Sequence, residues 1–526
     1  MLSLSIIAGI GIGYFFASHY AGNRMSIITS GSNKLNYLLQ IIDNQYVDSV
    51  DVNELIEDAM PQIIAELDPH SSYISADDAE ESVEDLEGRF FGIGVRFTVN
   101  NDTVNVMNVI KGGPSERVGI VAGDRIIAAD DSTLIGKENR EIMRRLRGPE
   151  GSKVRLTIAR RGTPEPVEIT VVRGNIPVES VDAYFMLNRT TGYISVESFG
   201  ANTYPEMLMA LARLNVEGMQ NLVVDLRGNR GGYMQTAIQM VNEFLPGRQL
   251  VVYTEGLHSP REDYTTDGRG SFQNIPIIVL VDEGSASASE IFAGAIQDND
   301  RGTIIGRRTF GKGLVQQPVE FRDGSIVRLT VARYYTPAGR CIQKPYEPGH
   351  GEDYEEDLIL RYERGEFFSA DSIHQDGPEY KTRLGRTVYG GGGIMPDVFV
   401  PEDTSLYTSY YKQAAYMGLI LQFAFQFTDQ HRPELSRLKS VAEMEQWLRR
   451  QNILEQFATF ADKHGLQRRN LMLQRSAPLF ERSLFANIIY DATDQEHRLQ
   501  YLCKQDPAII RALQIMESGT SRPTVE

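Results

Sequence analysis

Two short apolar runs, each followed directly by a turn and a helical pattern, constrain the fold of this chain most. They cover residues 221–226 and 276–281. The second is continuously apolar and rich in β-branched residues, and the first is apolar apart from Asn221 and Asp225, so both are typical of buried strands. Buried strands that lead directly into helices predict an α/β fold built on a parallel sheet.

A serine lies at the second of these turns. The run 276–281 is followed by Asp282-Glu283-Gly284, and a helical pattern begins at Ser287. Ser287 and Glu290 match the Ser-x-x-Glu capping box. A helix N-terminus also supplies N–H groups and a positive dipole end, which favour a developing negative charge. Ser287 is therefore an N-cap or a nucleophile, and as an isolated motif it favours the N-cap.

A lysine between two glycines shifts that balance towards catalysis. Lys312 lies in the segment 309–316, 25 residues after Ser287. Glycine lets backbone approach closely, which a surface lysine does not need. A lysine base must be neutral, which costs about 4.6 kcal/mol at pH 7 from a pKa near 10.4, and burial can supply a shift of that size. Gln316 either orients the amine through its amide oxygen or faces solvent on a strand.

A glycine-rich loop follows the first apolar run. Residues 227–232, Arg-Gly-Asn-Arg-Gly-Gly, lead into a helix expected from about 233 to 245. The backbone N–H groups near Gly231 and Gly232 predict an oxyanion hole, with a plain tight turn as the alternative. A phosphate site is disfavoured, because the loop lacks both the G-x-G-x-x-G spacing and the Lys-Ser/Thr pair of a P-loop.

Together these segments resemble the carboxy-terminal processing proteases, also called tail-specific proteases. That family pairs a Ser-Ala-Ser-Ala segment, here 285–288, with a Gly-Lys-Gly-x-Val-Gln segment, here 311–316. The resemblance implies that Ser287 is the nucleophile, that Lys312 is the general base and that Gln316 orients the lysine. No cofactor or metal is implied.

The resemblance extends over roughly residues 35–400 and includes the glycine loop. In the family's Leu-Arg-x-Asn-Pro-Gly-Gly pattern a proline stands where this chain has Arg230. This departure affects the expected stiffness of the loop and leaves both glycines in place. The resemblance implies that Gly231 and Gly232 belong to the oxyanion hole.

A β-rich stretch precedes the catalytic segments. The loop Phe91-Gly92-Ile93-Gly94 opens an apolar strand, Gly123-Asp124 forms a turn, and residues 154–160 alternate cleanly. About ninety residues of this kind suit a small module and resemble a PDZ domain. In such a domain the loop, here Phe91, Gly92, Ile93 and Gly94, holds a peptide carboxylate while the peptide adds as a strand to the sheet edge.

The expected architecture is a multidomain α/β protein: an α/β protease core of the tail-specific type, an inserted PDZ domain, and helical N- and C-terminal regions. An acidic, irregular stretch that includes Glu352 to Asp357 reads as an insertion or surface lobe. The predicted parts are a signal anchor or signal peptide at 1–22, an N-terminal helical region at 23–85, the PDZ domain at 86–175, the catalytic core at 176–345, an acidic insertion at 346–386, a return to the core at 387–403 and a C-terminal helical region at 404–526.

Composition excludes some partners. The 526 residues carry a net charge of −17, which argues against nucleic acid. The two cysteines, Cys341 and Cys503, lie in different predicted domains, so no disulfide is expected. The eight histidines are scattered without metal-ligand spacing, and His70 lies in a turn, where a structural role is expected.

The N-terminus is apolar from residue 2 to residue 17 apart from Ser3 and Ser5. This length suits a signal peptide and is marginal for a membrane span. The lack of a small-x-small cleavage site before Gly22 favours an uncleaved anchor, whereas Arg24 after the run opposes the positive-inside tendency. By resemblance the protease is exported, to the periplasmic face of the cytoplasmic membrane or, if cleaved, to the periplasm.

The sequence therefore predicts a serine endopeptidase with a Ser–Lys dyad. Its expected partners are polypeptides with free, apolar C-termini, and the helical ends are candidates for self-assembly or for docking a helper protein. Two alternatives stay open: a non-catalytic PDZ scaffold, and an amidase or esterase that uses the same Ser–Lys pair. The complete set Ser287, Lys312 and Gln316 disfavours the scaffold, because losing one member disables a nucleophile–base unit.

Overall fold

The computed structural model describes residues 31–100, 102–373 and 377–519, which fall into two compact units divided between Ile64 and Ala65. The first unit contains α2 (Gly31–Gln45) and nearly all of α3 (Val52–Ala65). Over the described ranges no helix has both the length and the apolar character needed to span a membrane. The predicted signal segment 1–22 lies outside them.

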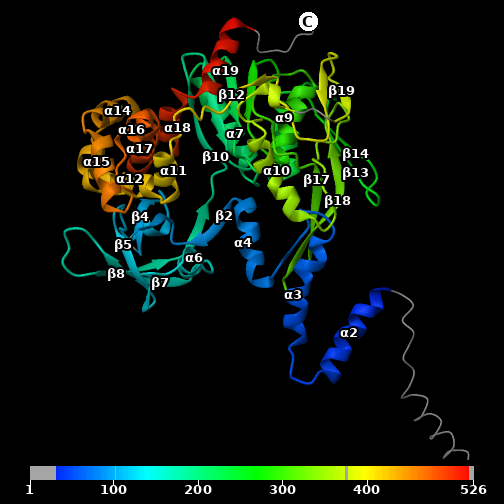
Figure 1. Cartoon of the computed structure of the whole chain (residues 1–526), viewed down its shortest axis with the longest axis horizontal. Coiled ribbons are helices and arrows are strands. Elements are labelled where there is room, and N and C mark those ends of the chain that lie inside the picture. Colours follow the sequence, from blue (N-terminus) through cyan, green and yellow to red (C-terminus); the bar gives the residue numbers. More distant parts are fainter. Residues whose placement is uncertain (1–30, 101, 374–376, 520–526) are drawn as a thin grey trace, which may run out of the picture. The chain divides into compact units, whose positions relative to one another are not determined.

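The centre of the second unit is a six-stranded sheet in the order β10-β11-β12-β15-β16-β21 (Figure 1). All neighbouring pairs are parallel except β10 with β11. The two apolar runs of the sequence are adjacent strands, with Leu222 opposite Ile277. The predicted α/β core is confirmed. Its strands are β10 (Val181–Met186), β11 (Thr191–Val196), β12 (Asn221–Asp225), β15 (Ile277–Val281), β16 (Thr303–Gly306) and β21 (Val398–Phe399).

Burial on both faces of this sheet explains why the two runs are continuously apolar. Alternate residues of a strand point to opposite faces. Leu222 and Val224 pack into the core formed with α7 (Thr203–Val216), α8 (Met234–Asn242) and α9 (Ala288–Asp298). Val223, between them, packs against the C-terminal helix α19 (Pro507–Ser518). Helix α19 is thus packed against the predicted catalytic core.

A second sheet carries the segment that follows Lys312. Strand β17 begins two residues after the lysine and pairs with the long strand β18. Strand β1 pairs with the other edge of β18 and brings the turn at residues 68–71 close to β17. The strands of this sheet are β1 (Ser72–Ile74), β13 (Leu250–Glu255), β14 (Glu262–Thr265), β17 (Leu314–Glu320) and β18 (Ile326–Tyr335).

The β-rich module has an apolar core of its own under a five-stranded antiparallel path, β3-β4-β5-β7-β8. Strand β3 is the terminal strand of this path. A separate pair, β2 with β9, joins the start and end of the module. Its elements are α4 (Ala76–Glu87), β2 (Arg89–Gly92), β3 (Val95–Asn100), β4 (Thr103–Val109), α5 (Pro114–Arg117), β5 (Arg125–Ala129), β6 (Ser132–Thr133), α6 (Asn139–Leu146), β7 (Lys153–Ala159), β8 (Val167–Val172) and β9 (Gly174–Pro177).

The acidic stretch after the core is more ordered than the irregular lobe that the sequence predicted. It contains α10 (Gly351–Glu363), η1 (Ala370–Ser372) and β19 (Glu379–Lys381), which pairs with β20 (Thr387–Tyr389). The difference arises because Tyr354, Arg361 and Glu366 are buried against the segment 308–311. Tyr354 is thus buried although it lies within the acidic run of the sequence.

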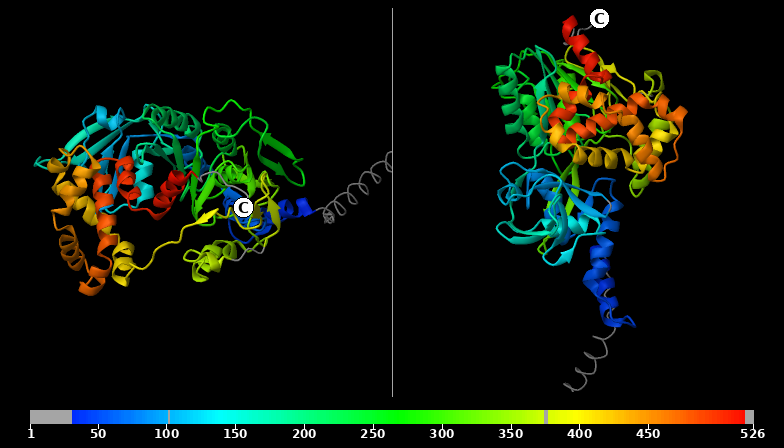
Figure 2. Two further views of the ribbon diagram at one scale, coloured as in Figure 1. Left: turned by 90° about the horizontal axis from the view of Figure 1, so that it is seen from above. Right: turned by 90° about the vertical axis from the view of Figure 1, so that its left-hand side faces the viewer.

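The C-terminal helices pack around an apolar core of their own (Figure 2). They also form hydrogen bonds with the β-rich module and with the catalytic core. Towards the β-rich module, Arg96 Nη1 donates to Tyr490 Oη at 3.0 Å and Asn108 Nδ2 donates to Thr493 O at 3.2 Å. Towards the catalytic core, Gln495 Nε2 donates to Asp182 at 3.2 Å. The helices are α11 (Ser409–Tyr416), α12 (Leu419–Gln430), α13 (Arg432–Leu435), α14 (Val441–Arg449), α15 (Ile453–Lys463), α16 (Asn470–Arg475), α17 (Ala477–Ala492) and α18 (Gln495–Cys503).

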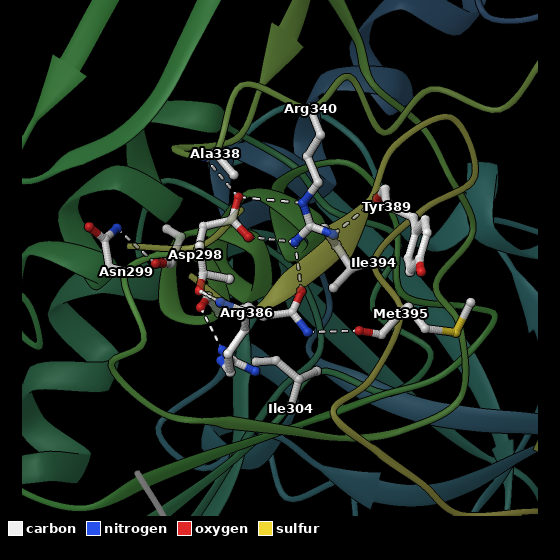
Figure 3. A network of polar contacts seen from close by, with 12 residues as sticks. Asp298, Asn299, Ile304, Ala338, Arg340, Arg386, Tyr389, Ile394 and Met395 are labelled. Carbon is white, nitrogen blue, oxygen red and sulfur yellow. Dashed lines mark hydrogen bonds and ion pairs between the residues drawn. The ribbon is translucent and has the colours of Figure 1, made fainter. Parts of the chain in front are cut away.

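A buried polar network anchors the C-terminal end of α9 (Figure 3). Asp298 and Arg340 form an ion pair at 2.7 Å in which both side chains are fully buried. Arg340 also donates to Gln297 Oε1 at 2.6 Å, and Gln297 donates to Met395 O at 2.8 Å. The helix that begins at Ser287 is therefore fixed at its far end.

Candidate active site

Ser287 lies in the turn between β15 and α9, immediately before the helix. Its backbone has φ 55° and ψ −114°, a combination that residues other than glycine rarely adopt and that costs about 1–3 kcal/mol. The Ser287 N–H donates to Glu290 Oε2 at 2.9 Å, as the capping pattern predicted. Ser287 is half-buried, and its position gives it access to the positive end of the α9 dipole.

The glycine loop between β12 and α8 packs directly on this turn. A Cβ atom at Gly231, where φ is +100°, would lie 2.7 Å from Ser287 Cβ and 2.8 Å from Ala286 O. The carbonyl of Asn229 accepts hydrogen bonds from Ala286 N at 3.0 Å and from Ser289 Oγ at 2.9 Å. The two segments that the sequence singled out therefore form one structure.

The two glycines of the glycine loop differ in whether their N–H groups have hydrogen-bond partners nearby. The Gly231 N–H donates to Asn229 Oδ1 at 2.8 Å. Gly232 forms a parallel bridge with Phe199, and the bridge's hydrogen bonds use Gly231 O and Tyr233 N. In this pattern the N–H of Gly232 itself points away from Phe199. The sequence analysis grouped Gly231 and Gly232 as oxyanion donors. It did not predict that the N–H of Gly231 donates to the side chain of Asn229.

The buried carboxylate of Glu290 joins the serine turn to the lysine segment. Its Oε1 accepts from Thr309 Oγ1 at 2.5 Å and from Gly311 N at 2.8 Å. Its Oε2 accepts from Ser287 N at 2.9 Å and from Lys312 N at 2.8 Å. Burial raises the pKa of Glu290 to about 7, while the four donors favour the ionised form. One side chain thus holds the backbone of both predicted catalytic residues.

Tyr334, on β18, makes a second connection between the same two residues. Its buried hydroxyl lies 3.0 Å from Ser287 O and also contacts Lys312 O. Because two separate partners are shared, the structure brings Ser287 and Lys312 together across the 25 residues that separate them in sequence.

The amine of Lys312 lies in an environment that favours its neutral form. Its Nζ donates to Gln316 Oε1 at 3.1 Å. Burial lowers the pKa of Lys312, and the positive charge of Arg328 lowers it further, whereas Asp68 and Glu290 act in the opposite direction. The net effect is a pKa below the ordinary lysine value, as a lysine base requires.

The turn at residues 68–71 fixes the side chain of Gln316. The sequence did not connect this turn with the site. Its Nε2 donates to His70 O, so that its Oε1 faces the lysine. Asp68 Oδ1 fixes this turn by accepting from His70 N and Ser71 N, each at 2.8 Å. His70 Nε2 lies 2.8 Å from Tyr354 Oη, and burial lowers the pKa of His70 to about 4. Local sequence contains no signal for this contact, because it joins residues 246 positions apart.

Comparisons with known proteins place these residues in a family. A model of peptidase family S41 matches residues 190–355, one of the PDZ domain matches 92–171, and one of a family of unknown function matches 410–494. A probable CtpA-like serine protease of Staphylococcus haemolyticus is 33% identical over 341 residues, which are 64% of this chain and 67% of that protein. The chain belongs to peptidase family S41.

Other relatives agree with this family. The carboxy-terminal-processing protease of Bartonella bacilliformis is 34% identical over 310 residues, covering 58% of this chain and 71% of that protein. Among solved structures, the photosystem II D1 C-terminal processing protease is 26% identical and covers 72% of this chain and 95% of that chain, with a TM-score of 0.36. The family models and the two curated relatives show that this S41 member is a serine peptidase of the carboxy-terminal processing type with a PDZ domain, which disfavours the scaffold alternative.

In the PDZ domain of this S41 peptidase, the predicted loop 91–94 begins within a strand: Phe91 and Gly92 are the last residues of β2, and Ile93 and Gly94 connect β2 to β3. Its carbonyls are tied to the body of the domain, since Phe91 O accepts from Gly148 N at 3.3 Å and Ile93 O accepts from Ser115 N at 2.9 Å. Phe91 also lines a cavity of about 670 Å³ together with residues of α6 that include Met143. The loop therefore lies between a cavity and a terminal strand.

The ordered insertion supports the lysine segment of the peptidase core. Tyr354 Oη accepts from Gln343 Nε2 at 3.1 Å, and Gln343 Oε1 accepts from Gly313 N at 2.8 Å. The same hydroxyl contacts the ring of His70, whose backbone carbonyl accepts from Gln316. Tyr354 thus contacts the partners of Gly313 and Gln316, both of which follow Lys312, a role that its acidic sequence surroundings did not indicate.

Proposed function

We propose that the protein is an endopeptidase in which Ser287 attacks the peptide carbonyl and neutral Lys312 accepts its proton. The observation that carries the proposal is the shared carboxylate of Glu290, which accepts the N–H of Ser287 at 2.9 Å and that of Lys312 at 2.8 Å. A nucleophile and a base that must exchange a proton need such fixed proximity.

Gln316 completes the proposed catalytic unit. Because its Oε1 accepts one N–H of the Lys312 amine at 3.1 Å, it restricts the rotation of the amine. The nitrogen lone pair of a neutral lysine is then available to the Ser287 hydroxyl. The His70 carbonyl keeps the amide in this orientation by accepting from Gln316 Nε2.

The reaction then proceeds through an acyl-enzyme. Ser287 Oγ bonds to the carbonyl carbon as its proton moves to Lys312 Nζ, and the protonated lysine gives that proton to the leaving amine. Water attacks the ester carbonyl and gives a proton to Lys312. The bond from the carbonyl carbon to Ser287 Oγ then breaks, Lys312 returns the proton to Ser287 Oγ, and the acid product leaves. We assign the oxyanion donors to the N–H groups of Gly232 and Ala288. Ala288 is the first residue of α9, where N–H groups lack partners within the helix.

Substrate selection is proposed to depend on the free C-terminus of the polypeptide. Strand β3 ends the sheet path β3-β4-β5-β7-β8, which suits the addition of an extended peptide as a further strand. The N–H groups of residues 91–94 at its start would hold the terminal carboxylate. Phe91 and Met143 offer apolar contacts for a terminal side chain in the cavity, whose other lining residues are mostly charged.

Degradation of a loosely folded reporter with an apolar C-terminal tail tests both parts. Wild type is expected to cleave the reporter, and Ser287→Ala and Lys312→Ala are expected to be inactive. Amidation of the tail removes its negative charge and is expected to slow cleavage strongly. Normal cleavage by Ser287→Ala contradicts the dyad, while cleavage indifferent to amidation retains the dyad and rejects tail selection.

We also propose that the protease acts outside the cytoplasmic membrane. The support is the apolar segment at residues 2–17 of the sequence. Protease added to intact spheroplasts is expected to digest the protein, and full protection until lysis would contradict export.

Self-association through the helical ends is proposed separately. In the first unit, α2 exposes Leu35, Tyr37 and Leu38. Light scattering of the chain with all three changed to Ser is expected to give a smaller mass than that of the unchanged chain. Equal masses would argue against assembly through α2.

A further inference from the structure

Arg227, at the start of the glycine loop, is held by two carboxylates from different parts of the chain. Its Nη2 donates to Asp225 Oδ2 at 2.6 Å, and its backbone N–H donates to Asp225 Oδ1 at 3.0 Å. Its Nη1 donates to Asp506 Oδ2 at 2.8 Å, 279 residues away. Only about a quarter of the Arg227 side chain is exposed, so water screens these pairs weakly.

The two oxygens of Asp506 have separate partners. Oδ1 caps helix α19 by accepting from Ala508 N at 2.9 Å and from Ile509 N at 3.2 Å. Oδ2 takes Arg227. Helix α19 itself packs on the face of the catalytic sheet that carries Val223. Asp506 therefore stands on a rigid element that lies against the core.

The loop that Arg227 begins is the one that packs on the nucleophile turn. Leu226 O accepts from Ser285 Oγ at 2.7 Å, and Gly228 N donates to Asp282 Oδ1 at 2.8 Å. Asp225 is the last residue of β12 and is fixed in the sheet, where its Oδ2 also accepts from Tyr193 Oη at 2.8 Å. Asp506 belongs to another element and contacts the opposite end of the guanidinium, so it adds a second point of attachment for Arg227 beside the sheet.

We propose that Asp506 is a positioning residue for catalysis: from the C-terminal helix it holds Arg227, and through Arg227 it places the glycine loop against Ser287. The inference rests on the proposed function, because it supposes that this loop holds the oxyanion. It assigns to the end of the C-terminal region a part in the chemistry of the core, which the sequence did not indicate.

The separate roles of the two oxygens allow the helix cap and the ion pair to be tested apart. Asn and Ser cap helices about as well as Asp, so Asp506→Asn and Asp506→Ser keep the cap of α19 and remove the ion pair. Asp494→Asn is the matched control, because Asp494 caps α18 by accepting from His497 N at 2.9 Å. Circular dichroism and thermal unfolding verify folding, and if one Asp506 variant fails to fold the other decides.

Turnover of an internally quenched peptide and inhibition by a matching peptide aldehyde give the readouts. Both Asp506 variants are expected to lower kcat about tenfold with KM within about twofold. The inhibition constant of the aldehyde, whose Ser287 adduct carries an oxyanion, is expected to rise by a similar factor. In an Arg227→Gln background the Asp506→Asn change is expected to add nothing further, because Asp506 acts through Arg227.

The outcomes separate this inference from the proposed function. If folded Asp506 variants match wild type in kcat and aldehyde binding, the positioning role is overturned and Asp506 only caps α19. A loss equal to that of Asp494→Asn overturns it as well. If Ser287→Ala cleaves the peptide as fast as wild type, the proposed function itself fails.

Discussion

Gly231 packs so closely on Ser287 that no side chain fits between them: a Cβ on Gly231 would lie 2.7 Å from the Cβ of Ser287. The glycine is required for the approach of the loop to the serine turn, besides its backbone φ of +100°. Proximity of the loop to the nucleophile is therefore a property that a single methyl group can remove.

Gly231→Ala is expected to reduce kcat at least about 100-fold, because the loop must move away from Ser287 and the oxyanion donors move with it. Gly228→Ala is the matched control. Gly228 lies in the same loop with φ +72°, but a Cβ there meets nothing within 4 Å. Its substitution should cost about 1 kcal/mol in stability and little activity. Equal activity losses in the two variants would show that strain rather than the contact is responsible.

Glu290→Gln is expected to impair catalysis and folding together. One carboxylate oxygen becomes an NH₂ group facing N–H donors, so a buried acceptor is replaced by a donor without a partner. We expect a loss of about 2 kcal/mol in the free energy of unfolding and a fall of at least about 30-fold in kcat. Denaturant titration and peptide turnover measure the two effects. Glu255→Gln, at an exposed position, should change neither quantity.

Arg328→Gln is expected to shift the pH dependence of the rate to higher pH. In the proposed mechanism Lys312 acts as a base in its neutral form, so kcat/KM should rise as pH increases through its pKa. Because the positive charge of Arg328 lowers that pKa, its removal raises the pKa and delays the rise. Profiles of kcat/KM against pH test the shift, with exposed Arg322→Gln as control. A shift to lower pH would contradict the assigned electrostatics.

Tyr354→Phe tests the support that the insertion provides. The change removes the hydroxyl that lies 2.8 Å from His70 Nε2 and accepts from Gln343 Nε2 at 3.1 Å. If the transition state loses about 1 kcal/mol of stabilisation because these hydrogen bonds no longer fix the site, kcat should fall about fivefold. Tyr362→Phe, on the same helix at an exposed position, should leave kcat unchanged. An unchanged rate for Tyr354→Phe would assign the insertion a purely structural role.

The buried pair that anchors α9 predicts a loss of stability. Arg340→Met leaves Asp298 charged and unpaired in a fully buried position, which is expected to cost about 3 kcal/mol of unfolding free energy. The double variant Asp298→Leu/Arg340→Met removes both charges and should recover part of this loss. Urea unfolding of the three proteins makes the comparison, and a double variant less stable than the single one would contradict the explanation.

The features that sequence could predict are those with local signatures. Continuous apolar runs required strands buried on both faces, and the structure pairs 222 with 277 in a central parallel sheet. The Ser-x-x-Glu pattern required a capped helix start, and Ser287 N donates to Glu290. The flanking glycines of Lys312 indicated close backbone contact. A Cβ at Gly311 would lie 3.2 Å from Gly393 N, and a Cβ at Gly313 would lie 2.8 Å from Gln343 N.

The contacts that orient the site depend on residues far apart in the chain, so the sequence carried no pattern for them. The His70 turn read as structural, yet its carbonyl holds Gln316. The acidic stretch read as a surface lobe, because charge dominates its composition while its buried residues, Tyr354 and Arg361, are spaced along a helix. Neither contact has a sequence period from which it could be inferred.

By itself the sequence determined the α/β class, because strand burial, glycine loops and capping act over a few neighbouring residues. The PDZ module and the residues proposed for catalysis followed from the resemblance of these segments to a known family. Tertiary structure alone decided which backbone N–H groups remain for an oxyanion, how burial and Arg328 lower the pKa of Lys312, and that Asp506 reaches Arg227. These properties depend on distance and desolvation in three dimensions, which only the packed core establishes.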